Sequence, residues 1–181
     1  MAKIYGLELK GIKTMIGRNG EVFQGNIYLE GKKIGVYSQD PNGGITPLIW
    51  MSDKYSKQKL EKIVSKEYLR NDNIWKVKED MMEHIDVLEE TFENIYTLKE
   101  WEKVFGKELK KRTRSFVMIV IPEDFQYRLY FTTNLMEDNE IKILCKKILN
   151  DLGEPKRKVF IFRSLEDFNY GHSIKLNDIM A

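Results

Sequence analysis

The sequence predicts an α+β fold: an N-terminal antiparallel meander of three to four strands, three central helices, and a C-terminal part ordered strand, strand, helix, strand. Three observations lead to this prediction. Apolar residues alternate with polar ones up to about residue 51, recur with a helical period from residue 52, and follow a strand pattern again after residue 114. The 181 residues are 42% hydrophobic and 32% charged, so the chain can bury a core and is not disordered in composition.

The meander is predicted from strand-like runs separated by tight turns. Interrupted alternation over residues 4–12 leads to an Arg-Asn-Gly turn at 18–20, which tolerates positive φ. Residues 22–30 and 33–38 form the next two strands and are joined by a turn at Gly31. A Pro- and Gly-containing loop at 40–44 then breaks the sheet, and residues 46–51 add a short strand.

The central part is predicted to hold three helices. Ser52 or Asp53 caps the first helix, and its apolar face is formed by Leu60, Ile63, Val64 and Leu69. The second helix runs from about residue 75 to residue 96. Thr97 is then expected to cap a third helix, because Glu100 lies three residues later as in a capping box.

The C-terminal part begins with a continuous apolar run at residues 116–121, which is typical of a central strand covered on both faces. A second strand follows at 125–133, a helix at 138–152 that ends at Gly153, and a last strand at 159–162. We therefore expect an N-terminal β-meander lobe at 1–51 and a helical and α/β lobe at 52–181, tightly packed on it.

Composition excludes several classes of protein. The net charge is only +2, so any basic surface must be local, and the single cysteine excludes a disulfide framework. No apolar run reaches the length of about 20 residues that a membrane helix needs, and the N-terminus lacks a signal-peptide core, which predicts a cytoplasmic protein. Cys145 falls on an apolar helix face and is expected to be buried.

Known catalytic patterns do not occur, and we expect a binding protein without a cofactor or metal site rather than an enzyme. The 28 Asp and Glu residues leave a metal-dependent nuclease or a nucleotide-modifying enzyme as a further alternative. Phosphate-binding glycine loops, nucleophile elbows and paired metal-ligand motifs are missing from the sequence. His84 and Asp80 stand four residues apart on one helix, but a histidine among carboxylates on an acidic helix is more often a surface residue than a metal ligand.

Charge is segregated along the second predicted helix. Five carboxylates step by four, three, four and three residues: Glu79, Glu83, Asp86, Glu90 and Glu93. They span an arc of about 80° and a length of about 21 Å, opposite the apolar face. One interpretation is an ordinary solvated face. The other is a row of carboxylates that imitates a nucleic-acid backbone and binds a basic channel of another protein.

Basic residues gather in two segments that precede predicted strands. The members that we consider as a nucleic-acid site are Lys110, Lys111, Arg112, Lys156, Arg157 and Lys158. Such clusters bind phosphates when they converge on one face. Alternatively, they are the ordinary cations of helix C-termini and of a solvated surface.

Residues 17–44 resemble the opening of small uncharacterised proteins of bacterial phages and mobile elements. In those proteins a strand of the type F-x-x-N-I-Y is followed by G-K-K-I-G and then by an Asn-Gly-Gly or His-Gly-Gly loop; residues 23–28, 31–35 and 42–44 carry the match here. Some proteins of this kind are suspected inhibitors of host defence, including anti-CRISPR inhibitors of the type II nuclease Cas9. The resemblance implies a phage setting and transfers no catalytic residue.

Together these observations favour an anti-defence binding protein in the bacterial host cell. We expect it to bind Cas9 or its complex with guide RNA through the acidic row, with the hairpin and the loop at 40–44 as a second contact. The alternative is an accessory protein that binds DNA or RNA through the basic clusters.

Overall fold

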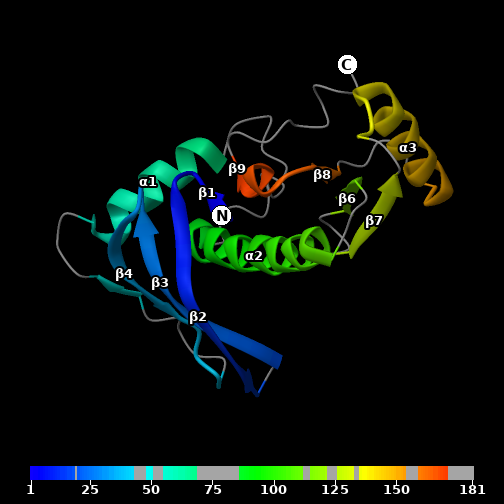
Figure 1. Ribbon diagram of the computed structural model, residues 1–181. Coiled ribbons are helices and arrows are strands. Elements are labelled where there is room, and N and C mark those ends of the chain that lie inside the picture. The colour runs from blue at the N-terminus through cyan, green and yellow to red at the C-terminus, as the bar shows by residue number, and fades with distance from the viewer. Residues whose placement is uncertain are drawn as a thin grey trace. The chain divides into compact units, whose positions relative to one another are not determined.

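The structure is a computed structural model, and it describes residues 1–18, 20–42, 48–50, 55–68, 86–111, 115–121, 126–132, 135–153 and 159–170 (Figure 1). The α+β fold class is confirmed. The chain divides into two compact units, Ala2–Leu98 and Lys99–Ala181, and Met1 groups with the second. The division falls within helix α2 (Val87–Lys111), whereas the boundary expected after residue 51 lies outside the described residues.

The first unit contains the expected antiparallel meander. Its strands are β1 (Lys3–Ile4), β2 (Leu7–Gly17), β3 (Gly20–Leu29), β4 (Lys32–Ser38) and β5 (Leu48–Trp50), and within this unit they lie in the order β5-β4-β3-β2-β1. The turn between β3 and β4 has positive φ angles at Glu30 and Gly31, so the predicted turn at Gly31 is confirmed. The short strand expected within 46–51 is β5.

Helix α1 (Lys57–Tyr68) and the first half of α2 contribute to the core of the first unit. On α1, Leu60 and Val64 are buried as expected, but Ile63 is 42% exposed, so its assignment to the buried face is wrong. On α2, Phe92 contacts Tyr37 of β4, with ring centroids 4.9 Å apart, and Tyr96 stacks on Phe23 of β3 at 4.2 Å. These aromatic contacts attach α2 to the sheet.

The predicted break at Thr97 is wrong, because α2 continues through this residue to Lys111. Glu100 does not cap a new helix; its side chain accepts a hydrogen bond from Lys103 at 2.5 Å. The reason lies in the apolar pattern, since buried residues continue at helical spacing on both sides of Thr97: Leu88, Phe92, Ile95, Leu98, Trp101 and Phe105. Asp86 precedes the helix, so the expected uninterrupted helix from 75 to 96 is also wrong.

The second unit has a three-stranded antiparallel sheet in the order β7-β6-β8, formed by β6 (Ser115–Ile121), β7 (Gln126–Thr132) and β8 (Phe160–Phe162). Helix α3 (Asp138–Asp151), the 3-10 helix η4 (Leu165–Phe168) and the two-residue strand β9 (Asn169–Tyr170) complete its described elements. Gly153 adopts φ 71° just after α3, which confirms the predicted helix end.

β6 is covered on both faces, as its continuous apolar sequence predicts. On one face Val117 and Ile119 pack with α3 in a cluster that includes Ile141 and Cys145. On the other face Phe116 contacts Phe105 of α2, with ring centroids 4.6 Å apart. The second unit is therefore built around this strand, with a helix on each side of it.

Candidate interaction surface

The structure describes three of the five acidic residues considered above, Asp86, Glu90 and Glu93, whereas Glu79 and Glu83 lie outside the described residues. All three are only partly exposed. His84 and Asp80, the histidine and carboxylate considered as metal ligands, also lie outside the described residues. The described members of this row lie at the start of α2.

Asp86 caps helix α2. One carboxylate oxygen, Oδ1, accepts hydrogen bonds from the backbone N–H groups of Leu88 and Glu89, both at 3.1 Å. The other, Oδ2, lies 2.5 Å from Nζ of Lys57 on α1. Burial disfavours the charged carboxylate, but the hydrogen bonds from Lys57 and the two N–H groups outweigh it and hold the pKa of Asp86 below its usual value. The same contact raises the pKa of Lys57.

Glu93 contacts the sheet of its own unit. Its Oε1 accepts a hydrogen bond of 2.9 Å from Nε2 of Gln39, and Gln39 also accepts one from the backbone N–H of Phe23. Burial raises the pKa of the Glu93 carboxyl, and the neighbouring charges of Glu90 and Glu89 raise it further, while the bond from Gln39 lowers it. Gln39 thus connects α2 to β3.

Asp86 and Glu93 thus have partners within the first unit that the expected acidic row did not include. Both side chains are partly exposed, and the row as a whole stays a prediction because Glu79 and Glu83 lie outside the described residues. Carboxylates can serve as helix caps and as acceptors for buried donors, which helical periodicity does not reveal.

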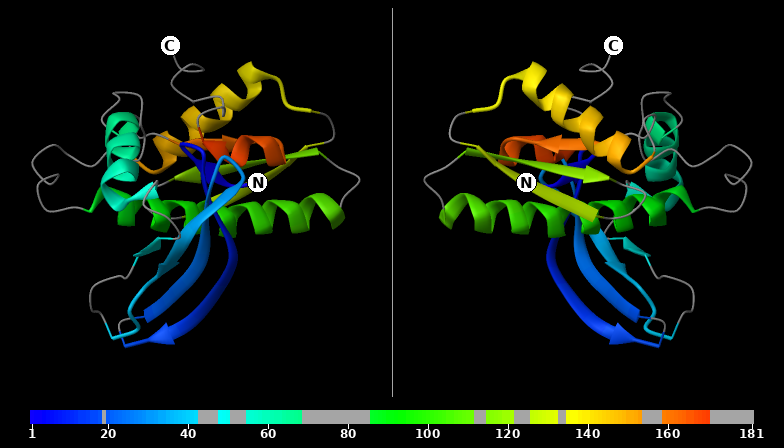
Figure 2. Two further views of the ribbon diagram at one scale, coloured as in Figure 1. Left: turned by 90° about the vertical axis from the view of Figure 1, so that its left-hand side faces the viewer. Right: turned by 90° about the vertical axis from the view of Figure 1, so that its right-hand side faces the viewer.

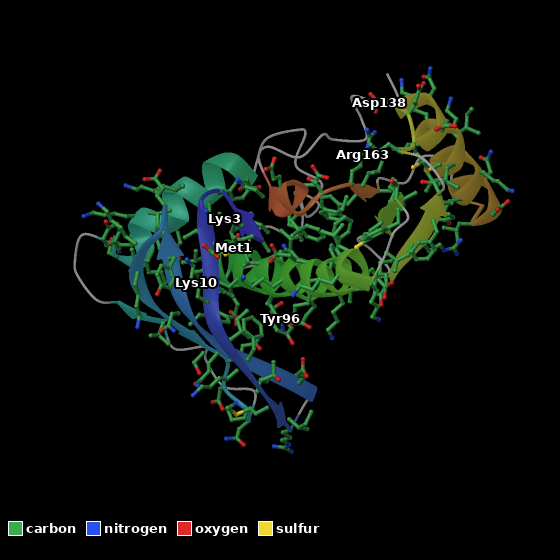
Figure 3. The ribbon with its side chains drawn as sticks, in the orientation of Figure 1. Met1, Lys3, Lys10, Tyr96, Asp138 and Arg163 are labelled. Carbon is green, nitrogen blue, oxygen red and sulfur yellow. The ribbon has the colours of Figure 1, made fainter. Side chains whose placement is uncertain are left out.

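The basic clusters are described only in part. Lys107, Lys110 and Lys111 are exposed on the last turns of α2, where cations interact favourably with the helix dipole. Lys111 also lies 3.3 Å from Glu108. Arg112, Lys156, Arg157 and Lys158 lie outside the described residues. Arg163 follows the second basic cluster in the sequence. Its Nη2 lies 2.6 Å from Oδ1 of Asp138 at the start of α3 (Figure 3).

Most side chains are exposed at the outer end of the β2–β3 hairpin, residues 13–18 and 20–22, which we call the outer hairpin (Figure 2). β2 pairs with β3 as far as Gly17 and Gly20, whereas β4 pairs with β3 only as far as Gln24. The outer hairpin is therefore a two-stranded ribbon that extends past the other strands of the sheet.

The outer hairpin carries two large apolar side chains on opposite faces. Met15 is 45% exposed and Ile16 is 82% exposed. They are opposite Val22 and Glu21 in the register, and two exposed cations, Lys13 and Arg18, stand on either side of them in sequence. Such an arrangement fits a partner surface that has an apolar recess and a polar rim.

Two contacts hold the outer hairpin in place. The backbone N–H of Arg18 donates a hydrogen bond of 2.7 Å to the carbonyl oxygen of Pro41, in the loop that follows β4. The hydroxyl of Tyr96 on α2 donates a hydrogen bond to the Glu21 carboxylate at 2.5 Å. An isolated two-stranded hairpin is marginally stable in water, so these contacts are needed to give it a defined shape.

A bulge separates the outer hairpin from the core of the sheet. The register between β2 and β3 shifts between Lys10 and Lys13, and Gly11 at this position has φ 61°. A side chain at Gly11 would begin 3.1 Å from the amide nitrogen of Asn26, whose side chain donates to the carbonyl oxygen of Lys10. The bulge changes the twist of the strand and so directs the outer hairpin.

The chain matches no protein-family model, no curated protein and no solved structure. Within the described residues, no three metal-ligating side chains lie together. None of the helices within the described residues is long and apolar enough to span a membrane. Cys145 is buried in α3 as expected, and burial raises the pKa of its thiol to about 11, with the nearby charge of Arg163 acting in the opposite direction.

Sequence reasoning did not single out Met15 and Ile16, because the hairpin that it considered a second contact is the one formed by residues 23–35. The available signal was strand length, because the strand that contains Leu7 and Leu9 reaches its predicted turn only at residues 18–20. Its 11 residues exceed the 7 residues of β4, which leaves its outer end without a third strand beside it.

Proposed function

We propose that the chain is an anti-defence binding protein that acts in the bacterial cytoplasm and binds a host nuclease through the outer hairpin. Cas9 with its guide RNA is the partner that the resemblance at residues 17–44 indicates. The observation that carries the proposal is the exposure of Met15 and Ile16 on a ribbon that two contacts, to Pro41 and Tyr96, hold in place. Inhibition would follow from occupying a surface that the nuclease needs for DNA binding or cleavage.

The physics of binding supports this surface. Apolar side chains that enter a recess of the partner contribute most of the affinity of many interfaces. A ribbon already held by Pro41 and Tyr96 loses little conformational entropy when it binds, because its backbone is ordered beforehand. Lys13 and Arg18 add attraction to a partner surface with acidic groups at its rim.

The outer hairpin also replaces the acidic row as the principal contact. Imitation of a nucleic-acid backbone requires carboxylates that face solvent in a row. Asp86 and Glu93 form bonds within the first unit, and reversing Asp86 would remove a helix cap as well as a charge. A charge reversal there is therefore a poor test of partner binding, and the hairpin offers a cleaner one.

The test is a cell-free DNA-cleavage assay with purified Cas9 and guide RNA, run with increasing amounts of the protein. The diagnostic variant is Met15→Thr/Ile16→Thr, which keeps strand-forming residues but removes apolar surface. The matched control is Leu135→Thr, because Leu135 is 79% exposed in the second unit. We expect inhibition by the wild type and the control, and at least about a tenfold loss of potency in the hairpin variant.

Two results would count against the proposal in different ways. Equal inhibition by the hairpin variant and the wild type would exclude the outer hairpin as the contact. Full cleavage in the presence of excess wild-type protein would exclude Cas9 as the partner. Circular dichroism of each variant establishes that the fold is retained.

A nucleic-acid-binding accessory protein is a second candidate, favoured by the exposure of Lys107, Lys110 and Lys111 on α2. It predicts a gel shift with DNA or RNA whose affinity falls linearly with salt on logarithmic axes. Lys110→Gln/Lys111→Gln should weaken the shift, whereas Lys146→Gln/Lys147→Gln, two exposed lysines of α3, should not. A shift that is the same for both variants, or is missing at low salt, would exclude this candidate.

A further inference from the structure

Strand β7 forms an edge of the sheet in the second unit, with β6 on its inner side (Figure 1). With 7 residues, Gln126–Thr132, it is the longest edge strand among the described residues. Proteins commonly protect such an edge with several charges, a proline or a bulge, because its backbone groups can pair with another strand. β7 has one charged residue, Arg128, and no proline, and it pairs with β6 without a register shift.

The two faces of β7 differ in character. Tyr127, Leu129 and Phe131 lie on the face where Phe131 meets Phe116, with ring centroids 5.9 Å apart. Tyr127 is 43% exposed and Phe131 is 42% exposed, so each ring presents part of its surface to solvent. On the other face Tyr130 packs against the α3 cluster, and Arg128 is exposed.

We propose that β7 pairs with β7 of a second copy of this chain, antiparallel and about a two-fold axis that passes through Leu129. This is the register in which all 7 residues of the strand find a partner, since Leu129 is its central residue. The two sheets then continue into one another through the pair of β7 strands. The dimer goes beyond the function proposed above and does not depend on it.

The sequence of β7 is complementary to itself in this register. Tyr127 of one copy stands opposite Phe131 of the other, which places two half-exposed aromatic rings side by side on each side of the axis. Arg128, the strand's one charge, stands opposite Tyr130 rather than opposite Arg128 of the second copy, so like charges do not meet. An arginine beside a tyrosine ring also allows a cation–π contact.

The first measurement is sedimentation velocity of the full chain over a wide range of concentration. A single strand is a small interface, so we expect a dimer that forms at high concentration and dissociates on dilution. A monomer at every concentration would overturn the proposal.

Charged variants then test the register. Tyr127→Lys/Phe131→Lys places lysine opposite lysine on both sides of the axis and should weaken dimerisation by at least about tenfold. Tyr127→Lys/Phe131→Glu places each lysine opposite a glutamate of the other copy and should restore the dimer. The control Met15→Lys/Ile63→Lys adds two lysines at positions that are 45% and 42% exposed on the first unit, and it should dimerise like the wild type.

Each remaining outcome is decisive. A dimer that persists in Tyr127→Lys/Phe131→Lys lies on another surface, which contradicts the proposal. If both charged variants are monomeric, pairing about Leu129 is wrong, because the lysine–glutamate variant has the complementary charges that this register requires. Circular dichroism checks that both variants keep the fold of the wild type.

Discussion

A side chain added at Gly17 would begin 2.7 Å from the carbonyl oxygen of Pro41, closer than a Cβ atom approaches a backbone oxygen in folded proteins. Gly17 precedes the β2–β3 turn, and Pro41 follows β4, so two segments 24 positions apart meet at the base of the turn. Only glycine allows this approach, because the neighbouring atoms belong to backbone and cannot rotate away. The contact ties the outer hairpin to the loop at 40–42.

Replacing Gly17 by alanine should therefore separate the outer hairpin from Pro41. We expect a loss of stability of about 1–3 kcal/mol, because backbone has to move to accommodate the new methyl group. The measurement is urea unfolding, combined with hydrogen exchange at the amide of Arg18, which donates to Pro41 and should exchange faster in the variant.

Gly106→Ala is the control with the opposite sign. Gly106 lies inside α2, and its nearest neighbour, Cδ2 of Leu165, is 3.9 Å from the position of an added Cβ. The substitution should stabilise the protein by about 0.5–1 kcal/mol, because alanine is energetically more favourable than glycine in the interior of a helix. Equal effects of the two substitutions would mean that the Gly17 contact has no special role.

Asp86 should contribute to stability both as a cap and as a charge. Asp86→Ala is expected to cost about 0.5–2 kcal/mol, and Asp86→Asn less, because asparagine keeps the cap and loses only the pair with Lys57. The pKa of Asp86 is lowered in the folded state, so the contribution of its charge is complete above the usual value of 3.8 and is lost as the pH falls through the lower folded value.

Unfolding curves of wild type and Asp86→Asn at neutral and acidic pH measure this charge contribution. The difference between the two proteins should shrink as the pH falls below the usual aspartate pKa. A difference that stays constant with pH would mean that the pair with Lys57 does not contribute.

The charge of Glu93 should affect stability in the direction opposite to that of Asp86. Its pKa is raised in the folded state, so the charged form weakens the fold above that pKa, and the effect disappears as the pH falls below the usual value of 4.5. Glu93→Gln keeps an oxygen for Gln39 and removes repulsion from Glu89 and Glu90, which should stabilise the protein by about 0.5–1 kcal/mol at neutral pH. Unfolding of the two proteins at neutral and acidic pH tests this, and destabilisation at neutral pH would contradict it.

Cys145 should be unreactive in the folded protein. It is buried against β6, and a thiol with a pKa of about 11 holds almost no thiolate at neutral pH. We expect a thiol reagent to modify it only as the second unit unfolds, so that labelling in increasing urea follows the unfolding curve. Rapid labelling without denaturant would show that the cluster around Cys145 opens easily.

The elements with a clear local pattern could be predicted from sequence. The Gly31 turn follows from the conformational freedom of glycine, and Gly153 ends α3 for the same reason. The continuous apolar run around Ile119 is typical of a strand covered on both faces, and the structure has a helix on each side of it.

Helix boundaries and side-chain roles could not be predicted in the same way. Thr97 and Glu100 have the spacing of a capping box, yet the helix continues because Leu98 and Trp101 are buried and packing outweighs a local cap signal. Glu93 has the spacing of a solvent-facing row, yet it accepts a bond from Gln39, a residue 54 positions away. Spacing along one helix says nothing about which strand lies beside it.

The sequence by itself determined the α+β class, the meander and its turns, and the central place of β6, because these depend on backbone preferences and apolar period within a short stretch of chain. Tertiary structure alone decided that Gly17 meets Pro41, that Asp86 and Glu93 are engaged within their unit, and that Met15 and Ile16 remain exposed. Those outcomes depend on contacts between residues distant in sequence, and such contacts form only when the strands and helices pack together.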